Sequence, residues 1–433
     1  MPRPNILYLH SHDSGRYVQP YGHAIPTPSI QRLAQEGVLF RQAFCAGPTC
    51  SPSRAALVTG MAPHNAGMIG LAHRGFSLND YGQHIANVLK GAGYRTALAG
   101  VQHVAAQPET IGYDEVLTHG RPDVANVAPA AGDWLAQAPS EPWFLSVGFF
   151  ETHREYPEPE ASEDLRYTLP PPTLPDTPET RYDMAAYKAS ARIYDQGVGA
   201  VLSALDASGQ ANNTLVINTT DHGIAFPGMK CNLTDHGIGV MLIMRGPGGF
   251  EGGRAIDAMV SHIDLFPTVC ELADVAPPDW LQGHSLLPLL HGQASEIREE
   301  IHAEVTYHAA YEPMRCVRTR RWKYIRRFDG RETPVLPNCD DSPSKSLRLE
   351  HGWADRPVDA EQLYDLVYDP QETQNLALLN AHPTVLAEMR GRLERWMQAT
   401  DDPLMRGPVP APSGAQVNDP DGLSPREACQ VIP

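Results

Sequence analysis

The sequence is poor in the features that build disulfide frameworks, zinc ribbons or membrane spans. Its seven cysteines are an odd number scattered over 433 residues, without a CxxC pair. This pattern argues against a disulfide framework and a structural zinc site, so reduced thiols are expected. No run approaches the roughly 18 consecutive apolar residues of a membrane span, and we therefore expect no membrane partner.

Basic residues are also scarce. The chain has 34 Lys and Arg residues against 51 Asp and Glu residues, a formal net charge of −17. Such a balance argues against nucleic acid as a partner, because phosphate backbones are bound by basic surfaces. The charge balance does not exclude anionic small molecules as substrates, since a few cations can gather in one cleft of an acidic protein.

The first residues, MPRPNILYLHSHD, lack a basic leader followed by a long apolar region and a cleavage site. We therefore predict a cytoplasmic protein that is not exported by this segment. The composition is also compatible with a homo-oligomer.

Apolar, β-rich runs alternate with amphipathic segments over much of the chain. This alternation predicts an α/β fold with a doubly wound, mostly parallel sheet flanked by helices. The expected strands are ILYLH (6–10), RTALAG (95–100), WFLSVGFF (143–150), TLVINTT (214–220) and VMLIMR (240–245). The expected helices lie at 28–37, 187–205 and 264–275.

The pattern changes in the last third of the chain. Residues 314–327 and 362–370 have the character of antiparallel strands, and 382–400 has helical spacing. We predict a catalytic domain at 1–300, a smaller α+β domain with an antiparallel sheet at 301–402, and a Pro-rich tail at 403–433. The proline-rich stretch 157–179 predicts a long loop near the mouth of a site.

Four of the apolar strands are followed by polar residues of the types that bind metals: His12-Asp13, His103, His153 and Asp221-His222. Ligands of doubly wound sheets bind at the carboxyl ends of the strands, so these side chains are expected in one cleft. A single such residue is more often a turn or cap residue, but four together favour a site. Carboxylates with imidazoles suit a divalent ion, Ca²⁺ or Mn²⁺.

The stretch CSPSR, residues 50–54, allows two interpretations. In the first, Cys50 is a packed thiol, Ser51 caps a helix, Pro52 occupies its first position and Arg54 is solvated. In the second, residue 50 is a nucleophile at a helix N-terminus, where the positive end of the helix dipole favours an anion.

The residues Cys50-Ser51-Pro52-Ser53-Arg54, followed by Thr59-Gly60, match the C-x-P-x-R…TG signature of the type I, formylglycine-dependent sulfatases. Family-like segments such as NILYLHSHD, GYRTALAGVQH and TLVINTTDHG follow in order, over about residues 4–400. The chain most resembles the heparan N-sulfatase (sulfamidase) branch, through FETHREYP, DHGIAFPGMK and EVTYHAAYEPMR. The resemblance implies the fold of the alkaline-phosphatase-like superfamily.

The resemblance further implies that a formylglycine-generating enzyme oxidises Cys50 to formylglycine, whose hydrated form attacks sulfur. Asp13, Asp221 and His222 would hold the metal with this modified residue, and Arg54 would anchor its oxygen. His103 would assist proton movement and His153 would protonate the leaving group. Lys230 would contact the sulfate oxygens.

Two departures from the family pattern stand out. His12 occupies a position where many members have Asp, which makes it a candidate replacement ligand. The segment Gly100-Val101-Gln102-His103 lacks the usual sulfate-binding lysine. By analogy with the sulfamidase branch, Glu304, His308 and Arg315 are candidates for the substrate pocket; the alternative is that they lie between domains.

The leading hypothesis is therefore a metal-dependent hydrolase of sulfate esters or sulfamates, acting on a small anionic sulfated sugar or aryl sulfate. The alternative within enzymes is a phosphonate monoester or phosphodiester hydrolase of the same superfamily, which Asp221-His222 also matches. The alternative of another class is an inactive protein that binds sulfated glycans.

Overall fold

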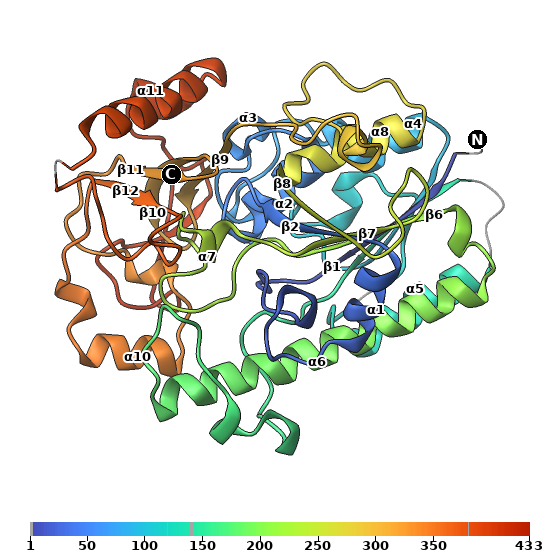
Figure 1. The fold of residues 1–433 in the computed structure, drawn as a ribbon, viewed down its shortest axis with the longest axis horizontal. Helices are drawn as coiled ribbons and strands as arrows, with labels where there is room; N and C mark the ends of the chain where they lie inside the picture. The colour runs from blue at the N-terminus through green and yellow to red at the C-terminus, as the bar shows by residue number, and fades with distance from the viewer. Residues whose placement is uncertain (1–2, 119, 138–141, 380) are drawn as a thin grey trace.

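The computed structural model describes residues 3–118, 120–137, 142–379 and 381–433, and its largest element is an eight-stranded sheet (Figure 1). In spatial order its strands are β4 (Glu115–Val116), β3 (Arg95–Gly100), β5 (Trp143–Gly148), β1 (Asn5–His10), β6 (Thr214–Thr219), β7 (Leu242–Arg245), β2 (Val38–Phe44) and β8 (Arg254–Ser261). Among these eight strands only β7 runs antiparallel to its neighbours. The prediction of a mostly parallel sheet is confirmed.

Helices cover both faces of this sheet (Figure 1). On one face lie α1 (Pro28–Glu36), α5 (Val124–Ala136) and α6 (Pro178–Ala207); on the other lie α2 (Cys50–Thr59), α4 (Ile85–Gly91) and α8 (Leu265–Leu272). Alternate residues of β1 pack against the two helix layers. Leu7 and Leu9 pack with α1, α5 and α6, and Ile6 and Tyr8 pack with α2, α4 and α8. Each buried Leu or Ile side chain stabilises the fold by about 1.5–3 kcal/mol.

Three strands of the sheet, β2, β4 and β8, lie outside the predicted strands, and β4 has only two residues. The segment VLFRQAF of β2 carries Arg41 and Gln42 in its middle, and the first half of β8 is exposed. Neither segment therefore has an uninterrupted apolar run. The long helix α6 begins nine residues before its predicted start, at a capping box formed by Thr177 and Thr180.

A second, four-stranded antiparallel sheet lies C-terminal to the first (Figure 1). Its strands are β12 (Glu361–Asp365), β11 (Trp322–Arg327), β10 (Tyr311–Arg318) and β9 (Ile301–Tyr307). Helix α11 (Pro383–Ala399) packs its apolar face against this sheet, as the helical spacing predicts. The remaining α-helices are short: α3 (Pro63–Ala66), α7 (Asp235–Ile238), α9 (Leu287–Leu290) and α10 (Pro343–Glu350).

The C-terminal tail is ordered against the rest of the chain. It contains a small hairpin of β13 (Gln416–Asn418) and β14 (Cys429–Val431). The Asn418 amide donates to the Ala309 carbonyl at 2.8 Å, and Arg74 donates to the Asn418 side chain at 2.7 Å. In the part of the chain that the structure describes, every helix is too short or too polar to cross a membrane.

Candidate active site

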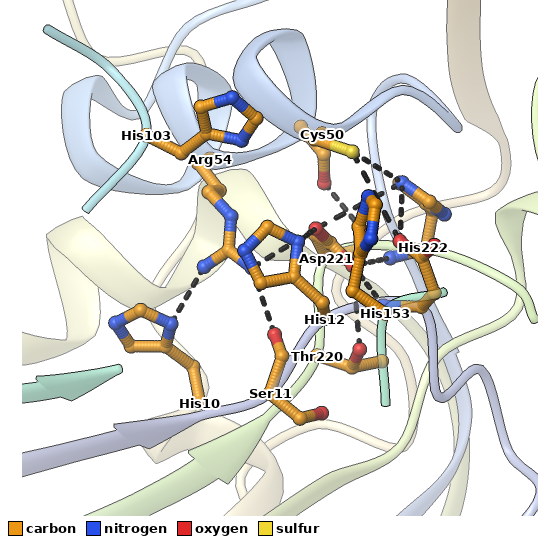
Figure 2. A network of polar contacts seen from close by, with 12 residues as sticks. His10, Ser11, His12, Cys50, Arg54, His103, His153, Thr220, Asp221 and His222 are labelled. Atoms are coloured by element: carbon orange, nitrogen blue, oxygen red, sulfur yellow. Dashed lines mark hydrogen bonds and ion pairs between the residues drawn. The ribbon is translucent and has the colours of Figure 1, made fainter. Parts of the chain in front are cut away.

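The polar residues that follow the central strands converge at one edge of the large sheet. Because β3, β5, β1 and β6 are parallel neighbours, their carboxyl ends lie together and bring His103, His153, Asp13 and Asp221 to one place. Figure 2 shows His12, His153 and Asp221 below Cys50 at the start of α2, with His103 to one side near Arg54. The predicted convergence is confirmed.

Cys50 is itself the first residue of α2, preceded by Thr49 in an extended conformation. Ser51 does not cap the helix; its hydroxyl instead accepts a hydrogen bond from the Ala72 amide at 3.0 Å. Pro52 is the third helical residue, and Arg54 is buried rather than solvated. The packed-thiol interpretation is therefore wrong in its details, and Cys50 lies at the positive end of the helix dipole.

Arg54 fixes the position of Asp221. One of its terminal nitrogens donates to Asp221 Oδ2 at 2.9 Å and to the Ser11 carbonyl at 2.8 Å, and the other donates to His10 Nδ1 at 2.6 Å (Figure 2). Burial by itself raises the pKa of Asp221, but the attraction of His222 and Arg54 holds it well below its usual range. Asp221 is therefore a buried anion whose orientation is set by an arginine.

Asp13 and Lys230 form the other buried pair of the site. Lys230 Nζ lies 2.9 Å from Asp13 Oδ2 and 2.9 Å from Asp340 Oδ2. Burial lowers the pKa of Lys230, but the two carboxylates raise it well above its usual value. Asp13 has a backbone φ of +41°, which places a non-glycine residue in the left-handed region at the site.

The Cys50 thiol faces these charged groups. Its Sγ lies 3.4 Å from His222 Nε2 and 3.9 Å from Asp13 Oδ1. Only 2% of Cys50 is exposed, and burial raises the pKa of its thiol well above the usual value, although Lys230 opposes this. Because the thiolate is the reactive form of cysteine, an unmodified Cys50 is a poor nucleophile at neutral pH.

Four residues of the site have the arrangement of a metal-binding group. Ligand atoms of His12, Asp13, Cys50 and Asp221 all lie within 4.8 Å of one another, and all four residues are buried. His12 Nδ1 lies 3.2 Å from Asp221 Oδ2, and His222 Nε2 lies 3.3 Å from Asp13 Oδ1. Two buried carboxylates bordered by imidazoles fit a divalent ion.

Histidines form one wall beside Cys50. His103, at a backbone φ of +56°, shares a 2.9 Å hydrogen bond with His73, and the rings of His12 and His153 are 5.3 Å apart. Burial and His73 lower the pKa of His103 well below its usual value. These residues line a cavity of about 630 Å³ that also contacts Phe150.

Sequence reasoning missed three contributors to the site: His10, His73 and Asp340. His10 ends strand β1, so a polar residue closing a buried strand was a usable signal. His73 lies in a three-residue 3₁₀ helix, Ala72–Arg74, and Asp340 lies in a loop; they contact His103 and Lys230, which are 30 and 110 residues away in the sequence. Neither segment carries a motif that distinguishes it from an ordinary connection between elements.

The three residues suggested for the substrate pocket lie in different places. Glu304 and Arg315 are buried in a separate cluster with His64 and Asp402, where Arg315 Nε lies 2.6 Å from Asp402 Oδ2. The Glu304 carboxylate is hydrogen-bonded to His64 and 3.7 Å from Arg315. The structure does not bring these two residues to the cavity. His308 is buried on the Lys230 side of the site, and burial and Lys230 lower its pKa.

Comparisons with known proteins agree with the geometry. A family model described as "Sulfatase" matches residues 4–275, and one described as "N-sulphoglucosamine sulphohydrolase, C-terminal" matches residues 229–351. Human N-sulphoglucosamine sulphohydrolase is 32% identical, over 93% of this chain and 92% of the relative.

Two solved structures share the fold. A 2-O GAG sulfatase superposes with a TM-score of 0.71 at 22% identity, over 95% of both chains. A protein solved in complex with its substrate, D-glucosamine-2-N,6-O-disulfate, superposes with a TM-score of 0.69 at 18% identity, over 94% of this chain and 99% of that one.

Proposed function

The chain belongs to the sulfatase family and is a sulfuric ester or sulfamate hydrolase, and from this premise we propose that residue 50, oxidised to formylglycine, is its nucleophile. The observation that carries the proposal is the environment of Cys50. Its buried thiol points at a carboxylate and an imidazole, yet it has a raised pKa that suits it poorly to attack. An aldehyde at this position hydrates to a geminal diol, which supplies oxygen nucleophiles in place of sulfur.

The diol accounts for both halves of a hydrolytic cycle. One hydroxyl attacks sulfur, and the bond from sulfur to the leaving oxygen or nitrogen breaks, which gives a covalent sulfate ester. The second hydroxyl then loses its proton and its oxygen forms the aldehyde carbonyl, which expels sulfate. A serine has no second hydroxyl and would require water for this last step.

The surrounding residues have separable roles in this proposal. Arg54, held by Asp221, places a guanidinium beside the start of α2 and orients the modified residue. Lys230 offsets negative charge on the sulfate oxygens as it develops. His153 protonates the leaving group and His103, held by His73, moves protons on the diol.

The donor set also fits a divalent cation, which would be held by Asp13, Asp221 and His222, with His12 as the additional nitrogen ligand. When bound, such an ion lowers the pKa of a hydroxyl and offsets anionic charge. The mixture of carboxylate and imidazole donors favours Mn²⁺, whereas Ca²⁺ prefers oxygen ligands.

The decisive experiment is mass spectrometry of the peptide that contains residue 50, together with activity assays on 4-nitrophenyl sulfate and glucosamine N-sulfate. The chain should be produced with and without a formylglycine-generating enzyme. We expect turnover to scale with the fraction of aldehyde. Equal turnover by fully unmodified protein would contradict the proposed nucleophile.

A second candidate activity is hydrolysis of phosphonate monoesters or phosphodiesters. It is favoured by the Asp221-His222 pair and by the similar tetrahedral geometry of sulfate and phosphonate. Paired assays on 4-nitrophenyl sulfate and 4-nitrophenyl phenylphosphonate distinguish the two. A dominant phosphonate rate would replace the sulfatase assignment as the main activity of the site.

A further inference from the structure

We infer that the substrate of this site carries one negative charge, on the group that is removed, and that the rest of the substrate is uncharged and partly apolar. This inference rests on the proposed function and narrows its substrate class. It depends on three observations: the lining of the cavity, the charge balance beneath it, and an exposed aromatic face.

The cavity beside Cys50 has no side chain of fixed charge among the described residues that line it. Its volume is about 630 Å³, and its lining combines four imidazoles with Phe150 and several small or apolar residues. Lysine, arginine, aspartate and glutamate are all absent from that described lining. The volume lies within the range of small-molecule sites and suits a body the size of a monosaccharide or an aryl group.

Together with the divalent ion of the proposed function, the charged side chains of the site balance a single anion. Three carboxylates, those of Asp13, Asp221 and Asp340, face two cations, Arg54 and Lys230, and each cation lies 2.9 Å from a carboxylate oxygen. The divalent ion of the proposed function would leave one net positive charge, which one sulfate offsets. A second anion would therefore meet no unpaired cation here.

Arg154 and Arg426 do not change this balance, because they already have acidic partners, and Arg74, which donates to the Asn418 side chain and the Pro425 carbonyl, is not among the residues that line the cavity. Arg154 donates to both oxygens of Asp183 at 2.6 and 2.9 Å and is buried. Arg426 pairs with Glu155. A second sulfate or a carboxylate held in the cavity would lose part of its hydration without gaining a charged partner, which is unfavourable.

Phe150 supplies the apolar face. It is 37% exposed, and its ring centroid lies 4.9 Å from that of His153 and 5.6 Å from that of His12. Its ring therefore borders both the proposed leaving-group acid and the strand-end ligands. An aromatic face at this distance suits an aryl ring or the C–H face of a sugar.

The test compares substrates that differ only in a second charge. We would measure kcat/KM for glucosamine N-sulfate and for glucosamine N,6-O-disulfate, following cleavage of the N-sulfate, at pH 8, where ordinary histidines are neutral. We expect the monosulfate to be preferred by about ten-fold or more. This is the size of effect expected when a buried polar group is left without a hydrogen-bonding partner. Equal or better use of the disulfate overturns the inference and leaves the proposed function intact.

The protein for this assay must have residue 50 fully converted, as shown by mass spectrometry. If such protein cleaves neither sugar nor 4-nitrophenyl sulfate, the proposed function fails and the inference fails with it. The two failures are therefore distinguishable.

Installing a cation in the cavity provides an independent check. Ala106 is exposed on the lining, so Ala106→Lys places an ammonium there, and Ala106→Gln is the uncharged control of similar length. We expect Ala106→Lys, but not Ala106→Gln, to shift the ratio of kcat/KM values toward the disulfate by about three- to ten-fold. An unchanged ratio in the lysine variant would contradict the charge argument.

Removing the aromatic face tests the other half of the inference. Phe150→Ala should raise KM for 4-nitrophenyl sulfate by about ten-fold, because the aryl group loses its apolar contact. Phe150→Leu keeps an apolar surface and should show a smaller rise. Unchanged KM in both variants would overturn the assignment of an apolar body.

Discussion

Two buried clusters of charged residues in this chain have similar compositions but differ in how completely their charges are paired. In the cluster of His64, Glu304, Arg315 and Asp402, each carboxylate oxygen has a donor or a nearby cation. Around Cys50, three carboxylates share two cations and the cluster borders a cavity. An excess of carboxylates over cations, together with access from a cavity, distinguishes the proposed reactive site from an internal support of the fold.

The sharpest way to test this contrast is to remove the reactive group. Cys50→Ala should lower sulfatase kcat by about 10⁴-fold or more, the scale expected when a covalent nucleophile is lost. Cys45→Ala, which removes another buried thiol of the same segment, should retain turnover in its folded fraction. Assays on 4-nitrophenyl sulfate provide the measurement, and equal losses in both variants would contradict a specific role for residue 50.

The next largest effect is expected at Lys230. Lys230→Met should lower kcat/KM by about 10²- to 10³-fold, because a preorganised cation no longer faces the developing charge. Lys323→Met is a matched control, since Lys323 is also buried between two carboxylates, those of Asp235 and Glu372.

The control variant should lose stability but keep its kcat/KM per folded molecule. Thermal unfolding separates the folded fraction from the rate. If the two lysine variants showed the same kinetic loss, Lys230 would act through the fold rather than on the substrate.

In the paired cluster the prediction is reversed. Arg315→Met should lower the free energy of unfolding by about 3–5 kcal/mol, because it leaves buried carboxylates without their cation. The kcat of the folded protein should change by less than about three-fold, since Arg315 does not border the cavity; denaturant titration and kinetics provide the two measurements. A large fall in kcat with unchanged stability would contradict this prediction and would indicate that Arg315 acts in the substrate pocket.

The smallest effect is the pH dependence carried by His64. Burial lowers the pKa of His64, but Glu304, the hydrogen bond to it and Asp402 outweigh burial and raise the pKa above its ordinary value. The protonated ring therefore stabilises the folded state below about pH 6.5, the ordinary histidine pKa, and this contribution is lost as pH rises through the raised value.

The measurement is Tm between pH 5 and pH 9 for the wild type and for His64→Asn. We expect the wild type to lose more Tm than the variant over the alkaline part of this range. Parallel profiles would show that His64 does not carry this dependence.

The sequence predicts which residues at the strand ends reach the site, but it does not predict which of them form ion pairs with one another. Asp13 and Asp221 follow the buried strands β1 and β6, whose apolar centres form a local pattern that places both residues at the sheet edge. Asp340 has no such pattern, and its role depends on Lys230, 110 residues earlier.

Charged residues in the smaller sheet show the same limit. Arg315 has the chemistry of an anion-binding residue, and only the structure reveals that it already donates hydrogen bonds to both carboxylate oxygens of Asp402. Likewise β2 and β8 form through neighbours in the sheet rather than through a local apolar run. Local patterns therefore predict which residues reach the site edge, but not which of their charges are satisfied.

The burial of α2 sets an order of events in the life of the chain. All ten residues of this helix are buried, so a modifying enzyme cannot bind the segment around Cys50 once the protein has folded. Under the proposed function, oxidation of this residue and folding are therefore competing processes, and whichever is faster decides the outcome for each molecule. On that proposal, a chain that folds first keeps its thiol, so the active fraction of a preparation depends on the relative rates of oxidation and folding during synthesis rather than on the assay conditions.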